Sequence, residues 1–227
     1  MKARVTIPIV AALLSMATAV GAASFRAVTA DEFDPGDTHL VQGSWLEGIG
    51  CPTEATIRPF DPSAPGGLGE PEEYTDPACE SGDPRDDRVE GLLLAKTGPT
   101  ENFASATAEL RGVRGMTVTE VGYDIRKPVA PFDPRGSHCG GGAPRFNLIT
   151  DSGTQFVGCN SVPPPSTVVI GNGWTRLRWT VTGVEVERIQ IVFDEGQDTG
   201  PDNFGLAVLD NISVNDVIVG QGNVDAD

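Results

Sequence analysis

Apolar and polar residues alternate over several short stretches of the chain, which predicts β-strands with one buried face. In the clearest stretch, Leu177, Trp179 and Val181 share one face, whereas Arg176 and Arg178 share the other. The predicted strands cover residues 38–45, 89–95, 116–125, 145–150, 154–159, 174–181, 188–193, 206–214 and 217–219. Short strands separated by Gly- and Pro-containing turns are typical of an antiparallel β-sandwich, and we expect a jelly roll.

The apolar parity changes between Val184, on an even position, and Ile189, on an odd one. A bulge or a turn at residues 185–188 would explain this change. Residues 151–153 are a favourable hairpin turn between two strands. The segment 103–110 is the best candidate for a helix, although alanine-rich strands of exported proteins have a similar pattern.

Residues 52–87 differ in composition from the rest of the chain, with seven prolines, four glycines and ten acidic residues. Proline lacks a donor for a strand ladder, and such a polar stretch has no continuous apolar face. We therefore expect an extended acidic surface loop within a single β-sandwich domain that covers residues 24–227. A linker between two domains is the alternative, but the segment before it is too short for its own core.

Residues 1–23 have the pattern of a signal peptide. Lys2 and Arg4 precede an apolar run over residues 5–17, and small residues follow it. Cleavage is expected near Ala22 or Ala23, with Ala30 as an alternative. A membrane anchor would need a longer span than this run, which Pro8 interrupts. We expect a secreted, extracellular protein that has no membrane attachment after cleavage.

The four cysteines fit this export, because an even number in an exported chain indicates disulfides. Three pairings are possible, and we expect Cys51–Cys79 with Cys139–Cys159, since each closes a local loop between predicted strands. A zinc site is the alternative, but the chain has no Cys-x-x-Cys pair. The cysteines therefore predict two bridges.

The formal net charge of −16 makes nucleic acid an unexpected partner, because the acidic chain repels phosphate. Cations and neutral ligands remain compatible with this charge. The most acidic short segment follows the strand at 188–193 and contains Asp194, Asp198 and Asp202 among glycines. Oxygen ligands on a tight backbone suit Ca²⁺, so these residues are candidate ligands of a structural calcium ion. The alternative is a solvated acidic turn.

Asp210 lies inside the last long strand, and strict alternation places it on one face with Ile212 and Val214. A carboxylate directed toward a core is unfavourable unless it is paired, hydrogen-bonded or bound to a metal. We therefore expect a cation, an arginine such as Arg126, or backbone donors beside Asp210.

Two stretches carry a family resemblance. Residues 209–214 (LDNISV) resemble the last strand of galactose-binding-like jelly rolls, the fold of many carbohydrate-binding modules. Residues 137–147 (SHCGGGAPRFN) and 193–215 resemble secreted bacterial proteins of uncharacterised function. The first resemblance implies a structural calcium ion near Asp210, but it transfers no sugar-binding residues.

Aromatic residues test the idea of a glycan ligand, because sugar rings stack on exposed aromatic side chains. Trp179 lies on the apolar face and is expected in the core. Trp174 lies on the polar face at the start of a strand, so it is the candidate ligand-binding residue, with rim packing as the alternative. The pattern leaves the role of Trp45 open.

Catalytic signatures are weak in this sequence. It has two histidines and neither a G-x-S-x-G nor an H-E-x-x-H motif. The favoured hypothesis is a secreted, non-catalytic β-sandwich module that binds an extracellular glycan or protein ligand. One alternative is an extracellular hydrolase that uses a carboxylate pair such as Glu185 and Glu187. The other is a structural cell-envelope protein without a small ligand.

Overall fold

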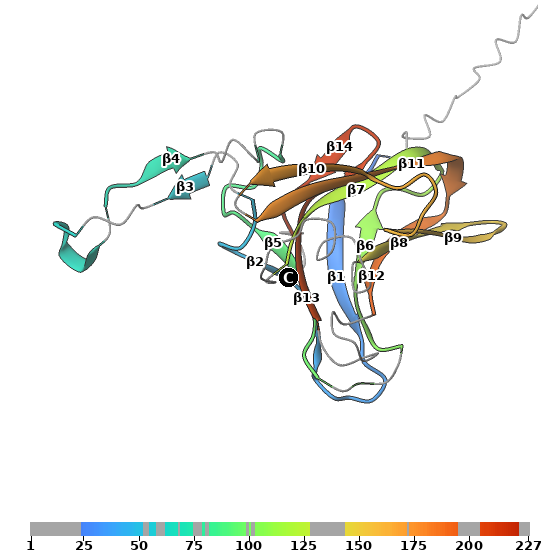
Figure 1. The fold of residues 1–227 in the computed structure, drawn as a ribbon, viewed down its shortest axis with the longest axis horizontal. Coiled ribbons are helices and arrows are strands. Elements are labelled where there is room, and N and C mark those ends of the chain that lie inside the picture. The colour runs from blue at the N-terminus through green and yellow to red at the C-terminus, as the bar shows by residue number, and fades with distance from the viewer. Residues whose placement is uncertain are drawn as a thin grey trace, which may run out of the picture.

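The computed structural model describes residues 24–51, 55–57, 62–67, 69–74, 79, 82–98, 100, 103–127, 144–171, 173–194 and 205–222. Most of these residues form two antiparallel sheets packed face to face (Figure 1). The predicted β-sandwich is therefore confirmed. The predicted signal peptide, residues 1–23, lies outside the described residues. Within those described, no helix is long and apolar enough to cross a membrane.

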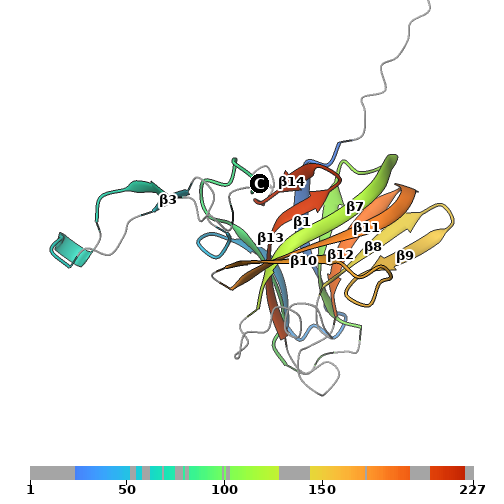
Figure 2. The same ribbon diagram turned by 45° about the horizontal axis from the view of Figure 1, so that its top comes forward.

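The smaller sheet has five strands in the order β1-β6-β12-β8-β9. These strands are β1 (Ala27–Phe33), β6 (Ser105–Arg111), β12 (Arg188–Phe193), β8 (Arg145–Thr150) and β9 (Gly153–Val157). β8 and β9 form the hairpin predicted at residues 151–153. Figure 2 shows β9 at the outer edge of this layer, with β8 inside it.

The larger sheet has seven strands, six of them in the order β10-β11-β7-β13-β5-β2. These strands are β10 (Ser166–Gly171), β11 (Trp174–Val186), β7 (Met116–Arg126), β13 (Gly205–Val214), β5 (Gly91–Lys96) and β2 (Val41–Leu46). The seventh, β14 (Val217–Val219), pairs with β13. β1 and β2 are thus edge strands of different sheets, and they contact each other along one seam of the sandwich.

At residues 185–188, where a bulge or a turn was expected, the chain crosses from one sheet to the other. β11 ends at Val186 in the seven-stranded sheet, and β12 begins at Arg188 in the five-stranded sheet. The single residue between them, Glu187, is exposed. A register shift between Thr180 and Val184 places the end of β11 on even positions, and the crossing returns the buried residues of β12 to odd ones.

The helix suggested at 103–110 is wrong, because this segment contributes strand β6. β6 pairs with β1 on one side and β12 on the other, and Ala106, Ala108 and Leu110 are fully buried. Alternation of small residues with polar ones therefore marks a strand packed closely against the opposite sheet. The first predicted strand also begins later than expected, at Val41.

The sequence pattern did not reveal β1 or β10. β1 is an edge strand in which only Val28 is buried and the last three residues are exposed, so its apolar alternation is weak. Two short strands also lie inside the acidic loop, where none was expected. They are β3 (Ala55–Ile57) and β4 (Glu72–Tyr74), joined across a 3₁₀ turn at Pro65–Gly67, and they lie apart from the two sheets (Figure 1).

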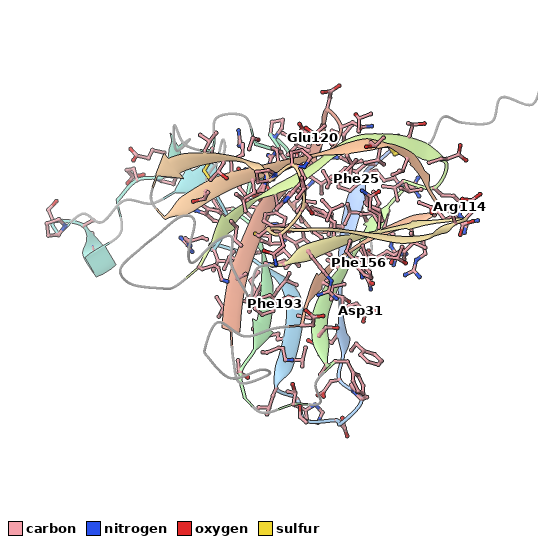
Figure 3. All side chains as sticks on the ribbon, turned by 45° about the vertical axis from the view of Figure 1, so that its right-hand side comes forward. Phe25, Asp31, Arg114, Glu120, Phe156 and Phe193 are labelled. Carbon is pink, nitrogen blue, oxygen red and sulfur yellow. A yellow bond between two sulfur atoms is a disulfide. The ribbon has the colours of Figure 1, made fainter. Side chains whose placement is uncertain are left out.

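Aromatic rings fill the middle of the core. Tyr123, Phe146 and Trp179 contact one another, with ring centroids 5.2 to 5.8 Å apart. The polar atoms of two of these rings are satisfied by backbone carbonyls, since Tyr123 Oη donates to Pro144 and Trp179 Nε1 donates to Gly158. Figure 3 labels Phe25 and Phe193, which are also buried.

A pair of identical substitutions in the β8–β9 hairpin tests this core. Phe146 is fully buried, whereas Phe156, labelled in Figure 3, is 63% exposed. Phe146→Ala should lower the free energy of unfolding by about 3–5 kcal/mol, because it removes transfer energy and leaves a cavity. Phe156→Ala should lower it by less than about 1 kcal/mol. Urea denaturation measures both, and similar losses from the two variants would contradict the assigned core face.

Candidate functional site

The predicted acidic ligands after β12 are only partly described. The carboxylate of Asp194 lies 2.6 Å from a guanidinium nitrogen of Arg145, and its backbone carbonyl accepts a hydrogen bond from Lys96 Nζ. Asp198 and Asp202 lie outside the described residues. Asp194 is therefore an ion-pair partner in the structure, and the calcium role of this segment stays a prediction.

A β-bulge in β13 determines where the Asp210 side chain lies. Asp210 pairs with Asp124 of β7, but Ser213 pairs with Gly122, so two residues of β13 oppose one residue of β7. Asn211, inside this bulge, has a φ of 47°. Such a bulge re-aims the side chains on either side of it.

The bulge corrects the expected facing of Asp210. Leu209 before it and Ile212 and Val214 after it all belong to the main core. The parity of the strand therefore changes at the bulge, and Asp210 lies on the outer face of the seven-stranded sheet instead of sharing a face with Ile212 and Val214. Strict alternation predicted the wrong face for Asp210, because the extra residue of the bulge reverses the alternation after it.

Backbone donors satisfy the carboxylate of Asp210, which is 1% exposed. One oxygen accepts a hydrogen bond from the Cys51 N–H and the other from the Asn211 N–H, each at 2.5 Å. Of the three partners expected for Asp210, the structure therefore has backbone donors. Arg126 instead donates to the Ile49 carbonyl at 3.2 Å.

Asp124, the neighbour of Asp210 across the ladder, is the centre of a buried ion network. Arg176 donates to both of its carboxylate oxygens at 2.8 Å, and a second guanidinium, that of Arg178, lies 3.4 Å away. The Asn211 side-chain amide donates to the same carboxylate at 2.9 Å. Such full hydrogen bonding is what makes a buried charge tolerable.

The same network reaches the end of the acidic loop at Asp83. Arg85 donates to both oxygens of the Asp83 carboxylate, at 2.6 and 2.8 Å. The Asp83 N–H donates to the Asn211 side-chain oxygen at 3.2 Å, and the Gly220 N–H donates to Asp83 at 3.1 Å. These contacts attach residues 83–90 to β13 and to the segment after β14.

Burial changes the acidity of this network. Burial raises the pKa of Asp210 well above its usual value, against the opposing effect of its two amide donors. Burial also raises the pKa of Asp86 to about 6, although backbone N–H groups of Glu90 and Arg88 oppose the shift. The pKa of Asp83 is lowered. Burial acts to raise it, but the hydrogen bonds to its carboxylate, led by that of Arg85, outweigh burial.

Three buried carboxylates near the bulge do not fit a calcium ion. The oxygens of Asp83, Asp124 and Asp210 all accept hydrogen bonds from N–H groups. A cation bound to these oxygens would be repelled by the positive hydrogen ends of those groups. In the part of the chain that the structure describes, no three His, Cys, Asp or Glu side chains are grouped to hold a metal.

Trp174 does not lie on an open surface, which corrects its expected role as an exposed platform. It is 1% exposed and packs with Cys51, Cys79 and Val208 in a second, smaller core. The guanidinium carbon of Arg126 lies 5.2 Å from the centre of its ring. Because it is buried against the disulfide of Cys51 and Cys79, the ring contributes to packing and is not available to a sugar.

The predicted Cys51–Cys79 disulfide is confirmed, with its two Cα atoms 5.7 Å apart. The disulfide packs beside Trp174 and Val208 on the outer face of the seven-stranded sheet. Cys159 is also disulfide-bonded. Its predicted partner, Cys139, lies outside the described residues.

A cleft that the sequence did not identify opens at the seam between β1 and β2, with a volume of about 460 Å³. This volume lies within the range of small-ligand sites. Its aromatic wall is Trp45, a half-buried residue near the end of β2. Trp45 Nε1 donates to the Val28 carbonyl of β1 at 2.9 Å, which fixes the ring across the seam.

Three charged side chains line the same cleft. Arg88 pairs with Glu47 at 2.7 Å through one terminal nitrogen and with Glu90 through the other. The Glu47 side chain is 65% exposed, whereas that of Glu90 is 6% exposed. Glu90 also accepts a hydrogen bond from the Gly222 N–H at 2.6 Å. We call the space lined by Trp45, Glu47, Arg88 and Glu90 the Trp45 cleft.

The Trp45 cleft was missed because its charged residues come from separate segments, residues 47 and 88–90, whose approach depends on the fold. The Gly48 N–H donates to the Arg88 carbonyl, and the Gly50 N–H donates to the Val89 carbonyl. The position of Trp45 at the end of an apolar strand was the one available signal.

Two smaller hollows lie near Val186, at the end of β11. One, of about 330 Å³, has residues 150–155 on its wall, and the other, of about 280 Å³, includes Arg114 and Glu187; both include Asp151 and Glu185. Glu185 and Glu187, the suggested catalytic pair, thus meet in one open hollow. Neither hollow has an aromatic wall on which a sugar ring would stack.

Comparisons with known proteins give distant structural similarities. No protein-family model and no curated protein matches the chain. The enzymatically active domain of tailspike protein 4 from bacteriophage CBA120 matches with 9% identity and a TM-score of 0.38, over 85% of this chain and 19% of that one.

Two carbohydrate-binding modules are also similar. A mutant of CBM29-2 complexed with mannohexaose has 9% identity and a TM-score of 0.30, covering 76% of this chain and 91% of that one. TmCBM61 in complex with β-1,4-galactotriose has 12% identity and the same TM-score, covering 85% and 90%. These similarities are too distant to support an argument about ligand or activity.

The raised pKa of Asp86 predicts a specific pH dependence of stability. A carboxyl whose folded-state pKa lies above its unfolded value of 3.8 stabilises the fold below about pH 4, and this contribution is lost as the pH rises through about 6. Asp86→Asn removes the titration while keeping an oxygen acceptor. Relative to this variant, the wild-type protein should lose up to about 3 kcal/mol between pH 4 and pH 7.

Urea denaturation at pH 4, 5, 6 and 7 measures this difference. Asp87→Asn is the matched control, because Asp87 is the exposed neighbour of Asp86. Its stability should follow the wild-type curve at every pH. A constant difference between wild type and Asp86→Asn across the whole range would show that Asp86 does not titrate in this window.

Proposed function

We propose that this protein is an exported, non-catalytic module that binds an extracellular glycan in the Trp45 cleft. One observation carries the proposal: an oriented, half-buried tryptophan shares a cavity of small-ligand size with hydrogen-bonding charged side chains. A sugar offers an apolar ring face and a rim of hydroxyl groups. The cleft offers an apolar wall for the first and carboxylate and hydroxyl acceptors for the second.

The fixed position of the ring supports binding. Because the Trp45 Nε1 donor is already satisfied by the Val28 carbonyl, the indole needs no rearrangement before a ligand packs against it. A preformed site loses less conformational freedom on binding than a site that must be ordered by its ligand. Ser44 and Thr29 add hydroxyl groups to the wall beside the ring.

The cleft contains two carboxylates, so hydrolysis is the competing function. A general acid must hold a proton before the reaction. Both oxygens of Glu90 accept hydrogen bonds, one from Arg88 and one from the Gly222 N–H, and Arg88 also pairs with Glu47. Both carboxylates are thus engaged by hydrogen-bond donors, which supports binding over acid–base chemistry.

Export forms the second part of the proposal. Residues 1–23 have the composition of a signal peptide, and the disulfide of Cys51 with Cys79 suits an oxidising compartment. We infer that the folded domain acts outside the cytosol, where it meets polysaccharide. Calcium is not part of this proposal, because the buried carboxylates of Asp83, Asp124 and Asp210 are already bound to N–H donors.

A glycan array with purified protein tests the proposal directly. Wild-type protein should bind at least one class of oligosaccharide, and Trp45→Ala should weaken that binding at least tenfold by removing the aromatic wall. Phe156→Ala removes another exposed aromatic ring, on β9, and should bind as the wild type does.

Thermal denaturation should show that both variants remain folded. Absence of binding to every glycan class would overturn the proposed function. Equal binding by wild type and Trp45→Ala would show that the glycan binds outside the Trp45 cleft.

A further inference from the structure

We propose that the Trp45 cleft selects glycans with unsubstituted amino sugars over neutral and anionic ones, an inference that rests on the proposed function. The cleft brings a tryptophan ring and an exposed carboxylate together at one opening. An amino sugar matches both, with an apolar ring face for the indole and an ammonium group for the carboxylate.

The charges in the cleft do not balance. Glu47 and Glu90 share the single cation Arg88, and these three are the charged side chains on its wall. The cleft therefore has one negative charge in excess, within a chain whose formal net charge is −16. A protonated amine is attracted by both the local and the overall field.

Arg88 is already engaged by two carboxylates. One of its terminal nitrogens contacts Glu47 and the other contacts Glu90, whose second oxygen is held by the Gly222 N–H. A uronate or sulfate group would have to share this one guanidinium with both carboxylates, whose negative charges repel it. The cleft therefore disfavours an anionic sugar.

Glu47 is the carboxylate that reaches the ligand. Arg88 donates to its Oε1, while its Oε2 accepts no hydrogen bond within the described residues. An ammonium group placed there lies in the same cleft as the Trp45 indole, a ring type whose face attracts cations. Because exposed ion pairs contribute little by themselves, we expect a moderate preference, of about fivefold to tenfold.

The test compares two ligands that differ only in whether the amino groups of their sugar units are free or N-acetylated. Calorimetry is run with a β-1,4-linked glucosamine tetramer and with its fully N-acetylated counterpart, at a mildly acidic pH where glutamate is ionised and the amines are protonated. Wild-type protein should bind the amine form about fivefold to tenfold more tightly, and 0.5 M salt should reduce this preference. Glu47→Gln should lower this preference to less than twofold, because it removes the charge that attracts the amine form alone.

Glu187→Gln is the matched control, since it removes the same charge from the exposed turn between β11 and β12. It should keep the full preference. Equal affinity of the wild type for the two tetramers would overturn this inference. An equal loss of the preference in Glu47→Gln and Glu187→Gln would also overturn it, because the amine would then be attracted by the whole acidic surface. If neither these tetramers nor any array glycan binds, the proposed function itself fails.

Discussion

The bulge in β13 at Asn211 is the constraint on which the rest of the molecule depends. It lets one strand supply the core through Leu209, Ile212 and Val214 and also turn Asp210 and Asn211 toward the outer face. Those two side chains then bind the backbone N–H groups of Cys51 and Asp83. A single extra residue in a strand therefore determines where two loop segments lie.

The two loop segments attached in this way also form walls of the Trp45 cleft. Residues 83–90 run from the Asp83 anchor to Arg88 and Glu90, and residues 47–51 run from Glu47 to the Cys51 anchor. The two segments are hydrogen-bonded to each other, and Glu90 in turn holds the Gly222 N–H. The cleft is thus formed where β2, these two segments and the chain after β14 meet, and each of them depends on buried polar contacts.

Buried charge is expensive, and the structure shows how it is tolerated here. Asp124 contacts two arginines and an amide, Asp83 one arginine and two backbone N–H groups, and Asp210 two backbone N–H groups. Such networks stabilise a fold when every member is satisfied and destabilise it when one is lost. The raised pKa values of Asp86 and Asp210 mark the positions where charge remains unfavourable.

Sequence patterns predicted the sandwich, the Cys51–Cys79 bridge and an irregularity at residues 185–188, because all three depend on local composition or periodicity. They failed where one residue changes a face or where distant segments meet. Strict alternation misplaced Asp210, and Trp174, expected on an open polar face, is buried against the disulfide of Cys51 and Cys79. Local sequence patterns could not identify the charged residues that line the cleft with Trp45. Glu47 and Arg88 are 41 residues apart and meet only because their loop segments pair in the fold.

Amide hydrogen exchange of wild type and Asn211→Ala tests the central claim most directly. If the bulge residue anchors the loop, the N–H groups of Asp83 and Glu90 should be protected in the wild type. They should exchange at least tenfold faster in the variant, while core amides of β7 and β11 keep their protection. Unchanged exchange at Asp83 and Glu90 in Asn211→Ala would contradict the account, because the loop and the cleft would then be held by something other than β13.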